Sequence, residues 1–545
     1  MREVSAARMI FSVGSGRIAL NDEGVITGAW HLSRPNDNYL CDTAQVRLWR
    51  DGKSVSWGQP DIQPDADEVQ IDWQSEGGLR LSVRHTFTAG WGLRLALINL
   101  TGEPQLLDDV ELTLQAAPGH LGWGLAAGCE AAFSIHPADG GSPVLGGVLR
   151  VGSIVSFSPA GANLGEVELP AHGRYVLSWQ WDWYANPRVF GRGRHTGVPD
   201  SLFLITEQPA RITAGPDTAV VAPWLHVLAE EGDTIELQAS APGVYGVELR
   251  SATGVIGYSL FAADPPDVFL TGLATSMLGG PRTPAGVVRI DDAAAGLVVQ
   301  QALSKGQLEQ PEDAADTLAR LAARITQTQN LDPLALAFLT GQAVAEGDAE
   351  LLDTVVTGLL ACSSATPGLG LAVLRLRAAS LVLGAPTRGA IERLRTMSES
   401  LDVERDNRAA EDPRAMVGRD VAALELAIVL GSVDFEVEAQ SGAEARVARL
   451  GRRLGAGLKG LPAEPVELVE LAQIAVVLDL LPERLGVAFG RRWLCSPGEL
   501  GRRARTEVIN RCTHQLRKHG RVSGEPPETI RQAAAWLALG QSTAG

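Results

Sequence analysis

The clearest candidate for ligand contact is a run of alternating aromatic residues in RYVLSWQWDWYANPRVFGRGRH, residues 174–195. Alternate residues of a strand share one face, so an indole recurs there at every second position: Trp179, Trp181 and Trp183. Indoles at this spacing can stack on pyranose rings, with Gln180 or Asp182 accepting hydroxyl hydrogen bonds. Large aromatic residues at alternate positions equally well fill the space between two packed sheets. Both interpretations remain open, and we expect Trp183 and Tyr184, at the end of the strand, to be the most exposed.

A concentration of basic residues follows this strand in an otherwise acidic region. Such a loop could receive an anion, a sugar acid or a carboxylate from the helical half, or it could be a solvated loop neutralised by nearby acids. The candidate ligand-binding residues of the chain are therefore Trp179, Trp181, Trp183, Tyr184, Arg188, Arg192 and His195.

Candidate catalytic acids are few, and they do not form a pair. Glycoside cleavage needs two carboxylates on either side of the scissile bond. Glu425 is an isolated acid in the apolar segment DVAALELAIVL of the helix predicted near residues 413–430. Either a buried general acid or a helix-rim acid facing an arginine would fit that position. Asp182 is the second weak candidate. The acids of residues 402–412 lie among arginines and predict a solvated loop, where carboxylates stay ionised.

No cofactor or metal site is expected. The nine histidines lack the spacing of zinc ligands, and the five cysteines include no CxxC pair. The oxygen-rich segment at residues 34–42 lacks the spacing of a calcium loop and is better explained by turn formation.

Charge argues against two classes of partner. The chain has a net charge of −17 and a pI near 5.1, which disfavours nucleic acids and excludes an anionic membrane surface. Its first residues contain no apolar run of signal-peptide length, and we expect a cytoplasmic protein. From residue 486 onward the balance reverses, with ten Lys and Arg against four acids. Solvated helix faces are the simplest interpretation of these basic C-terminal helices, which could also contact the N-terminal half or a protein partner.

Composition divides the chain into two architectures. Residues 1–270 hold ten of the twelve Trp and all five Tyr, and their period-two patterns predict antiparallel strands. After residue 290 the apolar period becomes that of helices rich in Ala and Leu. The expected domains are a large antiparallel β-sandwich (1–200), a small immunoglobulin-like β-sandwich (201–270), a linker (271–289) and an all-α array or (α/α) toroid (290–545).

Residues 79–115 resemble the N-terminal β-sandwich of glycogen-debranching and glucoamylase-like proteins, the six-hairpin glycosidases. In that family a strand ends in Asn-x-Thr/Ser before the next strand, as Asn99-Leu100-Thr101 does here. The resemblance implies an (α/α)6 barrel after the sandwich, with catalytic carboxylates on loops rich in Trp and Tyr. The helical half instead contains no Tyr, and its only tryptophans are Trp493 and Trp536. This departure favours a non-catalytic descendant of such enzymes.

Three functional hypotheses follow from these patterns. The leading one is a carbohydrate-related protein of glycosidase-like architecture that binds or organises rather than hydrolyses. The second is a scaffold for protein partners, and the third is an active glycoside hydrolase or phosphorylase.

Overall fold

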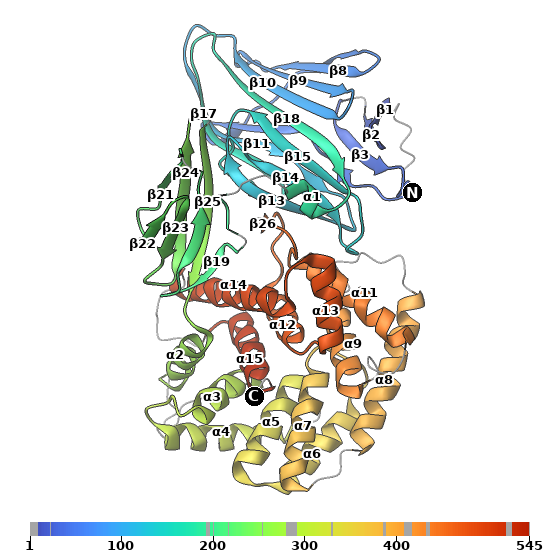
Figure 1. Ribbon diagram of the computed structural model, residues 1–545, viewed down its shortest axis with the longest axis vertical. Helices are drawn as coiled ribbons and strands as arrows, with labels where there is room; N and C mark the ends of the chain where they lie inside the picture. Colours follow the sequence, from blue (N-terminus) through green and yellow to red (C-terminus); the bar gives the residue numbers. More distant parts are fainter. Residues whose placement is uncertain are drawn as a thin grey trace.

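The computed structural model consists of a β half and a helical half that meet along one face (Figure 1). The residues that the structure describes are 9–21, 23–191, 197–199, 201–215, 217–252, 254–279, 292–328, 331–384, 388–407, 417–431, 437–518 and 526–543. The predicted order, antiparallel β-sandwich followed by a helical array, is confirmed.

Most strands are short and joined by tight turns. Those up to residue 184 are β1 (Met9–Val13), β2 (Gly16–Leu20), β3 (Ile26–His31), β4 (Leu40–Cys41), β5 (Val46–Arg50), β6 (Lys53–Ser54), β7 (Asp61–Pro64), β8 (Glu68–Gln74), β9 (Leu79–Phe87), β10 (Trp91–Asn99), β11 (Gln105–Thr113), β12 (Gln115–Ala116), β13 (His120–Gly128), β14 (Ala132–Pro137), β15 (Val144–Val151), β16 (Ser156–Ser158), β17 (Gly161–Leu169) and β18 (Arg174–Tyr184). After the short helix α1 (Pro187–Gly191) come β19 (Phe203–Ile205), β20 (Ala210–Thr213), β21 (Ala219–Val221), β22 (His226–Glu231), β23 (Thr234–Gln238), β24 (Gly243–Ser251) and β25 (Gly254–Ala263).

One long sheet connects the two β regions. Its thirteen strands include the path β21-β24-β25-β13-β14-β15-β18-β10-β9-β8-β7, so the strands of residues 243–263 continue the large sheet through β13. The sheet β16-β17-β11-β5-β6 contributes to the large core, and β20-β23-β22 contributes to a second, smaller core around Ile212 and Leu237. The region expected as a separate small sandwich thus has its own core but shares a sheet with its neighbour.

Strands β9 and β10 form as their alternation predicts. Leu79, Leu81 and Val83 are buried on one face of β9, and the antiparallel register pairs Leu81 with Leu97 of β10. Asn99 ends β10 and is buried, and its Nδ2 donates to the carbonyls of Glu103, Leu169 and Pro170. The side chain therefore ties this strand junction to the end of β17.

The helices of the second half begin directly after β25. They are α2 (Pro266–Leu278), α3 (Ala293–Ser304), α4 (Pro311–Ile325), α5 (Pro333–Glu346), α6 (Ala349–Ala361), α7 (Leu369–Leu383), α8 (Arg388–Asn407), α9 (Val417–Leu430), α11 (Val437–Arg453), α12 (Leu468–Asp479), α13 (Glu483–Trp493), α14 (Pro497–Lys518) and α15 (Glu528–Thr543). Helices α3, α5, α7, α9, α12 and α15 each contact the next, and α15 also contacts α3.

Helix α2 occupies residues that the sequence pattern placed at the end of the sandwich and in a linker. Pro266 stands in its first turn, where a missing N–H costs nothing, and Asp267 favours the same helix end. Residues 280–289 of the expected linker, and residues 290 and 291 after it, lie outside the described part of the chain. None of the described helices has the length and apolarity needed to cross a bilayer.

The two halves are joined by hydrogen bonds to backbone groups. Strand β26 (Leu461–Pro462), from the helical half, pairs with β13, and the Trp123 indole donates to the Lys459 carbonyl at 2.8 Å. In the basic helix α14, Asn510 Nδ2 donates to the carbonyl of Ala262 at 2.7 Å and Arg517 to that of Pro242 at 2.7 Å. Part of the basic C-terminal segment thus contacts the β half of its own chain.

Candidate functional site

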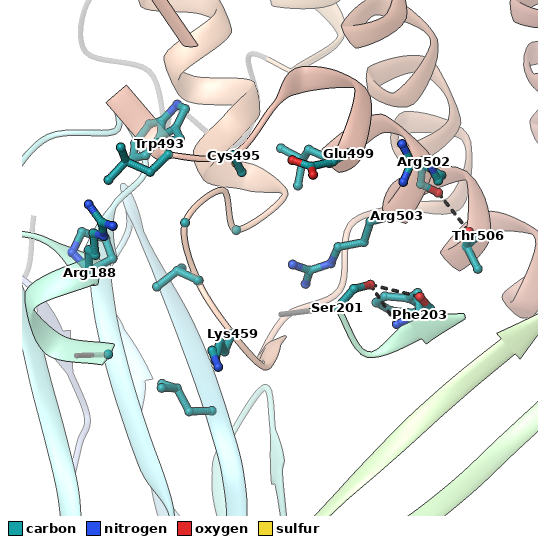
Figure 2. Close-up of a pocket in the computed structure, with 18 of the residues that line it drawn as sticks. Arg188, Ser201, Phe203, Lys459, Trp493, Cys495, Glu499, Arg502, Arg503 and Thr506 are labelled. Carbon is teal, nitrogen blue, oxygen red and sulfur yellow. Dashed lines mark hydrogen bonds between the residues drawn. The ribbon is translucent and has the colours of Figure 1, made fainter. Parts of the chain in front are cut away.

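A cavity of about 1080 Å³ lies where the β half meets helices α13 and α14 (Figure 2). Helix α1 and the start of β19 line one side, the loop that precedes β26 lines another, and the α13–α14 turn closes it. The fold brings these segments together from distant parts of the sequence. The volume of the cavity slightly exceeds that of most sites for small organic ligands and leaves room for several sugar rings.

Positive charge dominates the described lining. Four of its residues are cationic and one, Glu499, is acidic; the cationic residues are Arg188, Lys459, Arg502 and Arg503. Arg188 is exposed on α1, and no described carboxylate lies within ion-pairing distance of it. In a chain of net charge −17, this local excess of cations favours an anionic ligand.

Arg503 projects from α14 toward the centre of the cavity in Figure 2. Its guanidinium donates to the Gly460 carbonyl at 3.2 Å and lies 5.9 Å from the Trp123 ring and 5.8 Å from the Phe203 ring. Burial among these groups lowers the pKa of Arg503 from its ordinary value, and a guanidinium keeps its charge in proteins. The side chain is therefore a positioned cation with donors to spare for a carboxylate.

Lys459 is held beside the arginine by the loop that contains it. Its Nζ donates to the Val198 carbonyl at 2.8 Å, while its own carbonyl accepts from Trp123. Gly457 and Gly460 flank the lysine with positive φ angles of 73° and 89°, and a Cβ at Gly460 would lie 2.1 Å from the Gly124 carbonyl oxygen. Glycine is required there because the loop passes so close to β13.

Glu499 helps to cap the N-terminus of α14. Its carboxylate accepts hydrogen bonds from both the backbone N–H and the hydroxyl of Ser496, and the Glu499 N–H donates back to that hydroxyl at 3.0 Å. This reciprocal capping box lowers the pKa of Glu499, so the group is ionised at neutral pH. A carboxylate in this state accepts hydrogen bonds but cannot donate a proton to a leaving group.

Cys495 and Trp493, which also line the cavity, are poorly placed for nucleophilic attack or for stacking on a sugar. Burial raises the pKa of the Cys495 thiol, which keeps it protonated and poorly nucleophilic. The Trp493 indole is 7% exposed, with the guanidinium carbons of Arg452 and Arg492 at 4.4 and 5.1 Å from its ring. These cation–π contacts occupy the ring and leave little of it for a sugar face.

The structure separates the aromatic ladder into core and rim. Trp179 and Trp181 are 1% and 0% exposed and pack in the large sandwich core, so they present no surface to a ligand. Trp183 is partly buried between His31 and Tyr39, with ring centroids 5.1 and 4.9 Å away. Tyr184 packs edge-on against Phe190 of α1 and so supports the helix that carries Arg188. Of the candidate ligand residues, Arg188 lines the cavity, while Arg192 and His195 lie outside the described residues.

The two candidate acids lie apart from the cavity lining. Asp182 is exposed on β18 and its Oδ1 accepts from the N–H of Trp183 at 2.7 Å. Glu425 is buried within the helical half, where burial raises its pKa to about 8. Its carboxylate accepts the Gly368 N–H at 2.8 Å, at the start of α7. Glu425 therefore faces backbone N–H groups, and not the arginine that a helix-rim position predicts.

The cations supplied by α14 and by the loop before β26 were not among the predicted site residues. The basic C-terminal segment was visible in the sequence as a possible contact surface, yet nothing there indicates that Arg502 and Arg503 face the β half. For Lys459 the sequence did contain an indication of a site. Lysine occurs only four times in the chain, and this one lies between Gly457 and Gly460.

No described group of three or more His, Cys, Asp and Glu side chains is arranged to hold a metal ion.

Comparison with known proteins shows similarity of fold. No protein-family model matches the chain, and no curated protein matches its sequence. A solved polysaccharide lyase is similar to 91% of this chain and 92% of its own, with a TM-score of 0.70 and 12% identity. A putative kojibiose phosphorylase from the human microbiome is also matched, at 7% identity over 97% of this chain and 86% of its own, but its TM-score of 0.25 is too low to indicate a shared fold. The chain therefore has a β-sandwich plus helical architecture found in a carbohydrate-active enzyme.

Proposed function

We propose that the chain binds an acidic carbohydrate in the cavity between its two halves. The observation that carries the proposal is the convergence of Arg188, Arg502 and Arg503 on one cavity in a strongly acidic chain. Arginine presents planar donors that match a carboxylate in two hydrogen bonds. The uronate carboxylates of an acidic glycan are ligands of this kind, and the fold shared with a polysaccharide lyase supports a carbohydrate over other organic acids.

Binding rather than glycoside hydrolysis is supported by what the described lining contains. Hydrolysis requires an acid held protonated opposite a second carboxylate. Glu499 is the acidic side chain among the described lining residues, and its hydrogen bonds from Ser496 favour the ionised form. Glu425, whose pKa burial raises to about 8, is a buried group outside the cavity lining.

Isothermal calorimetry with two matched ligands tests the proposal: oligogalacturonates, which carry a carboxylate on each ring, and neutral maltooligosaccharides. We expect heat of binding with the acidic series and much weaker binding with the neutral one. Arg503→Met and Arg188→Met should weaken binding, whereas Arg211→Met is the control because Arg211 is exposed on β20 and paired with Glu236. Equal binding of both series, or none of either, would overturn the assignment.

The same samples test for turnover. An unsaturated uronate product would be detected by its ultraviolet absorbance, and reducing ends would report hydrolysis. Either product, formed by the wild type and lost in Arg503→Met, would show catalysis and contradict the binding-only part of the proposal.

A further inference from the structure

A second hollow, of about 820 Å³, lies within the helical half. It is formed by α3, α4, α5 and α7, which lie at the far end of the molecule from the large sandwich (Figure 1). Its lining shares no residue with the cavity between the halves, so the two are separate sites.

The inner part of this hollow contains an arginine without a counter-ion. Arg375 of α7 donates to the Ala337 carbonyl at 3.1 Å and to Gln300 Oε1 at 3.2 Å. Among the described residues, no carboxylate lies within ion-pairing distance of it. Burial lowers the pKa of Arg375 to about 10, which still leaves it charged at neutral pH. A charge in this position is stabilised when an anion reaches it.

Gly341 makes room for this arrangement. A Cβ at that position of α5 would lie 2.7 Å from Arg375 Nη2 and 2.2 Å from Gln300 Oε1. The guanidinium therefore rests directly on the backbone of α5. Gln300 is itself fixed, because its Nε2 donates to the Phe338 carbonyl at 3.3 Å. The helices thus hold both polar side chains in place before any ligand arrives.

The walls around this polar group are largely apolar. Their apolar side chains come from α3, α4, α5 and α7, with Ala538 of α15 in addition; they are chiefly Leu297, Leu318, Val344, Ala378 and Val382. Val344 and Val382 are 41% and 71% exposed, so apolar surface continues from the hollow to the solvent. Such walls suit a hydrocarbon chain. Polar and charged side chains also line the hollow, among them Ser304, Lys305, Asp316, Gln342 and Glu346.

We propose that this hollow binds a small amphiphilic carboxylate, with its head group on Arg375 and its hydrocarbon chain along the walls formed by α3, α4, α5 and α7. The carboxylate supplies the missing counter-ion, and the chain covers apolar surface that water would otherwise contact. A neutral apolar molecule would leave the arginine charge uncompensated, and a small inorganic anion would leave the walls exposed.

Calorimetry on the full chain with octanoate, octanol and acetate tests both parts of the inference. We expect octanoate to bind roughly tenfold or more tightly than octanol, from the charge-assisted hydrogen bonds, and acetate to bind too weakly to detect. Arg375→Met should remove the preference for octanoate over octanol. Arg395→Met, which removes an equal charge from an exposed pair with Glu392 on α8, should leave it unchanged.

A second variant keeps the test decisive if Arg375→Met unfolds the chain. Ala378 is exposed and lines the hollow, so Ala378→Phe fills space without disturbing the core and should abolish octanoate binding. Equal affinity for octanoate and octanol, no binding of octanoate, or unchanged binding by Ala378→Phe would each overturn the inference. Octanoate binding that Arg188→Met weakens would place the ligand in the cavity between the halves and also refute it.

Discussion

The carboxylate of Glu425 lies at the N-terminus of helix α7, where the backbone N–H of Gly368 donates to it at 2.8 Å. Gly368 precedes the first residue of α7 and has a φ of 94°. Because glycine has no side chain, Gly368 cannot itself cap the N–H groups of the helix. Glu425 of α9 supplies that cap from a neighbouring helix. The relationship explains an acid on an otherwise apolar helix without any catalytic role.

Replacing Glu425 therefore tests a structural function. In Glu425→Ala the N–H groups at the start of α7 lose their acceptor in a buried site, and we expect a loss of about 1–3 kcal/mol in the free energy of unfolding. Glu425→Gln keeps an acceptor oxygen of the same shape and should retain most of the stability at neutral pH. Urea denaturation of the three proteins measures both effects. Equal stability of Glu425→Ala and the wild type would contradict the capping role.

The raised pKa of Glu425 predicts that the stability of the fold depends on pH. Burial raises the pKa of Glu425 to about 8 from an ordinary value of 4.5. Between these values the folded chain retains a proton that the unfolded chain has released, so this group makes stability fall as pH rises through the window. Glu425→Gln cannot ionise and should lack that component. Denaturation midpoints from pH 5 to pH 8 should thus favour the variant increasingly, and a constant difference between the two proteins would contradict the prediction.

The aromatic ladder predicts two different phenotypes. Trp181 is 0% exposed and stacks on Trp91 at 5.3 Å, so Trp181→Ala should destabilise the chain by about 3–5 kcal/mol. Trp183 lies at the partly buried strand end, and Trp183→Ala should cost less. Thermal unfolding compares them. If Trp183 contacts ligand, as the sequence pattern suggests, its replacement should also weaken oligosaccharide binding in calorimetry, and unchanged binding would remove it from the candidate site.

Local patterns predicted the elements well because each depends on its own residues. The alternation in residues 79–99 indicates strands, and β9 and β10 follow it with apolar residues buried at every second position. The ladder of tryptophans indicates one face of a strand, but whether that face meets another sheet or solvent depends on the fold of residues far away. Trp179 and Trp181 were therefore ambiguous, and the packing of the sandwich decides the matter.

The cavity could not be predicted for the same reason. Arg188 and Arg503 come from distant parts of the chain, and they line the same cavity because α14 packs against the β half. The pairing of β26 with β13 and the hydrogen bonds of Asn510 fix that crossing. The basic C-terminal segment is visible in the sequence, whereas the surface it faces depends on these tertiary contacts.

The positive charge of Arg503 should contribute both to the affinity for an anionic ligand and to its salt dependence. If Arg503 binds a uronate carboxylate, Arg503→Met should weaken oligogalacturonate binding by about 1.5–3 kcal/mol, roughly 10- to 150-fold in Kd. Arg503→Lys keeps the charge but loses the two-pronged donor geometry, so its loss should be smaller but real. Raising the salt concentration should weaken wild-type binding more than that of Arg503→Met, because screening acts on the charge that the variant lacks. Identical salt dependence in the two proteins would mean that Arg503 does not contact the anion, and the site would then have to rest on Arg188 and Arg502.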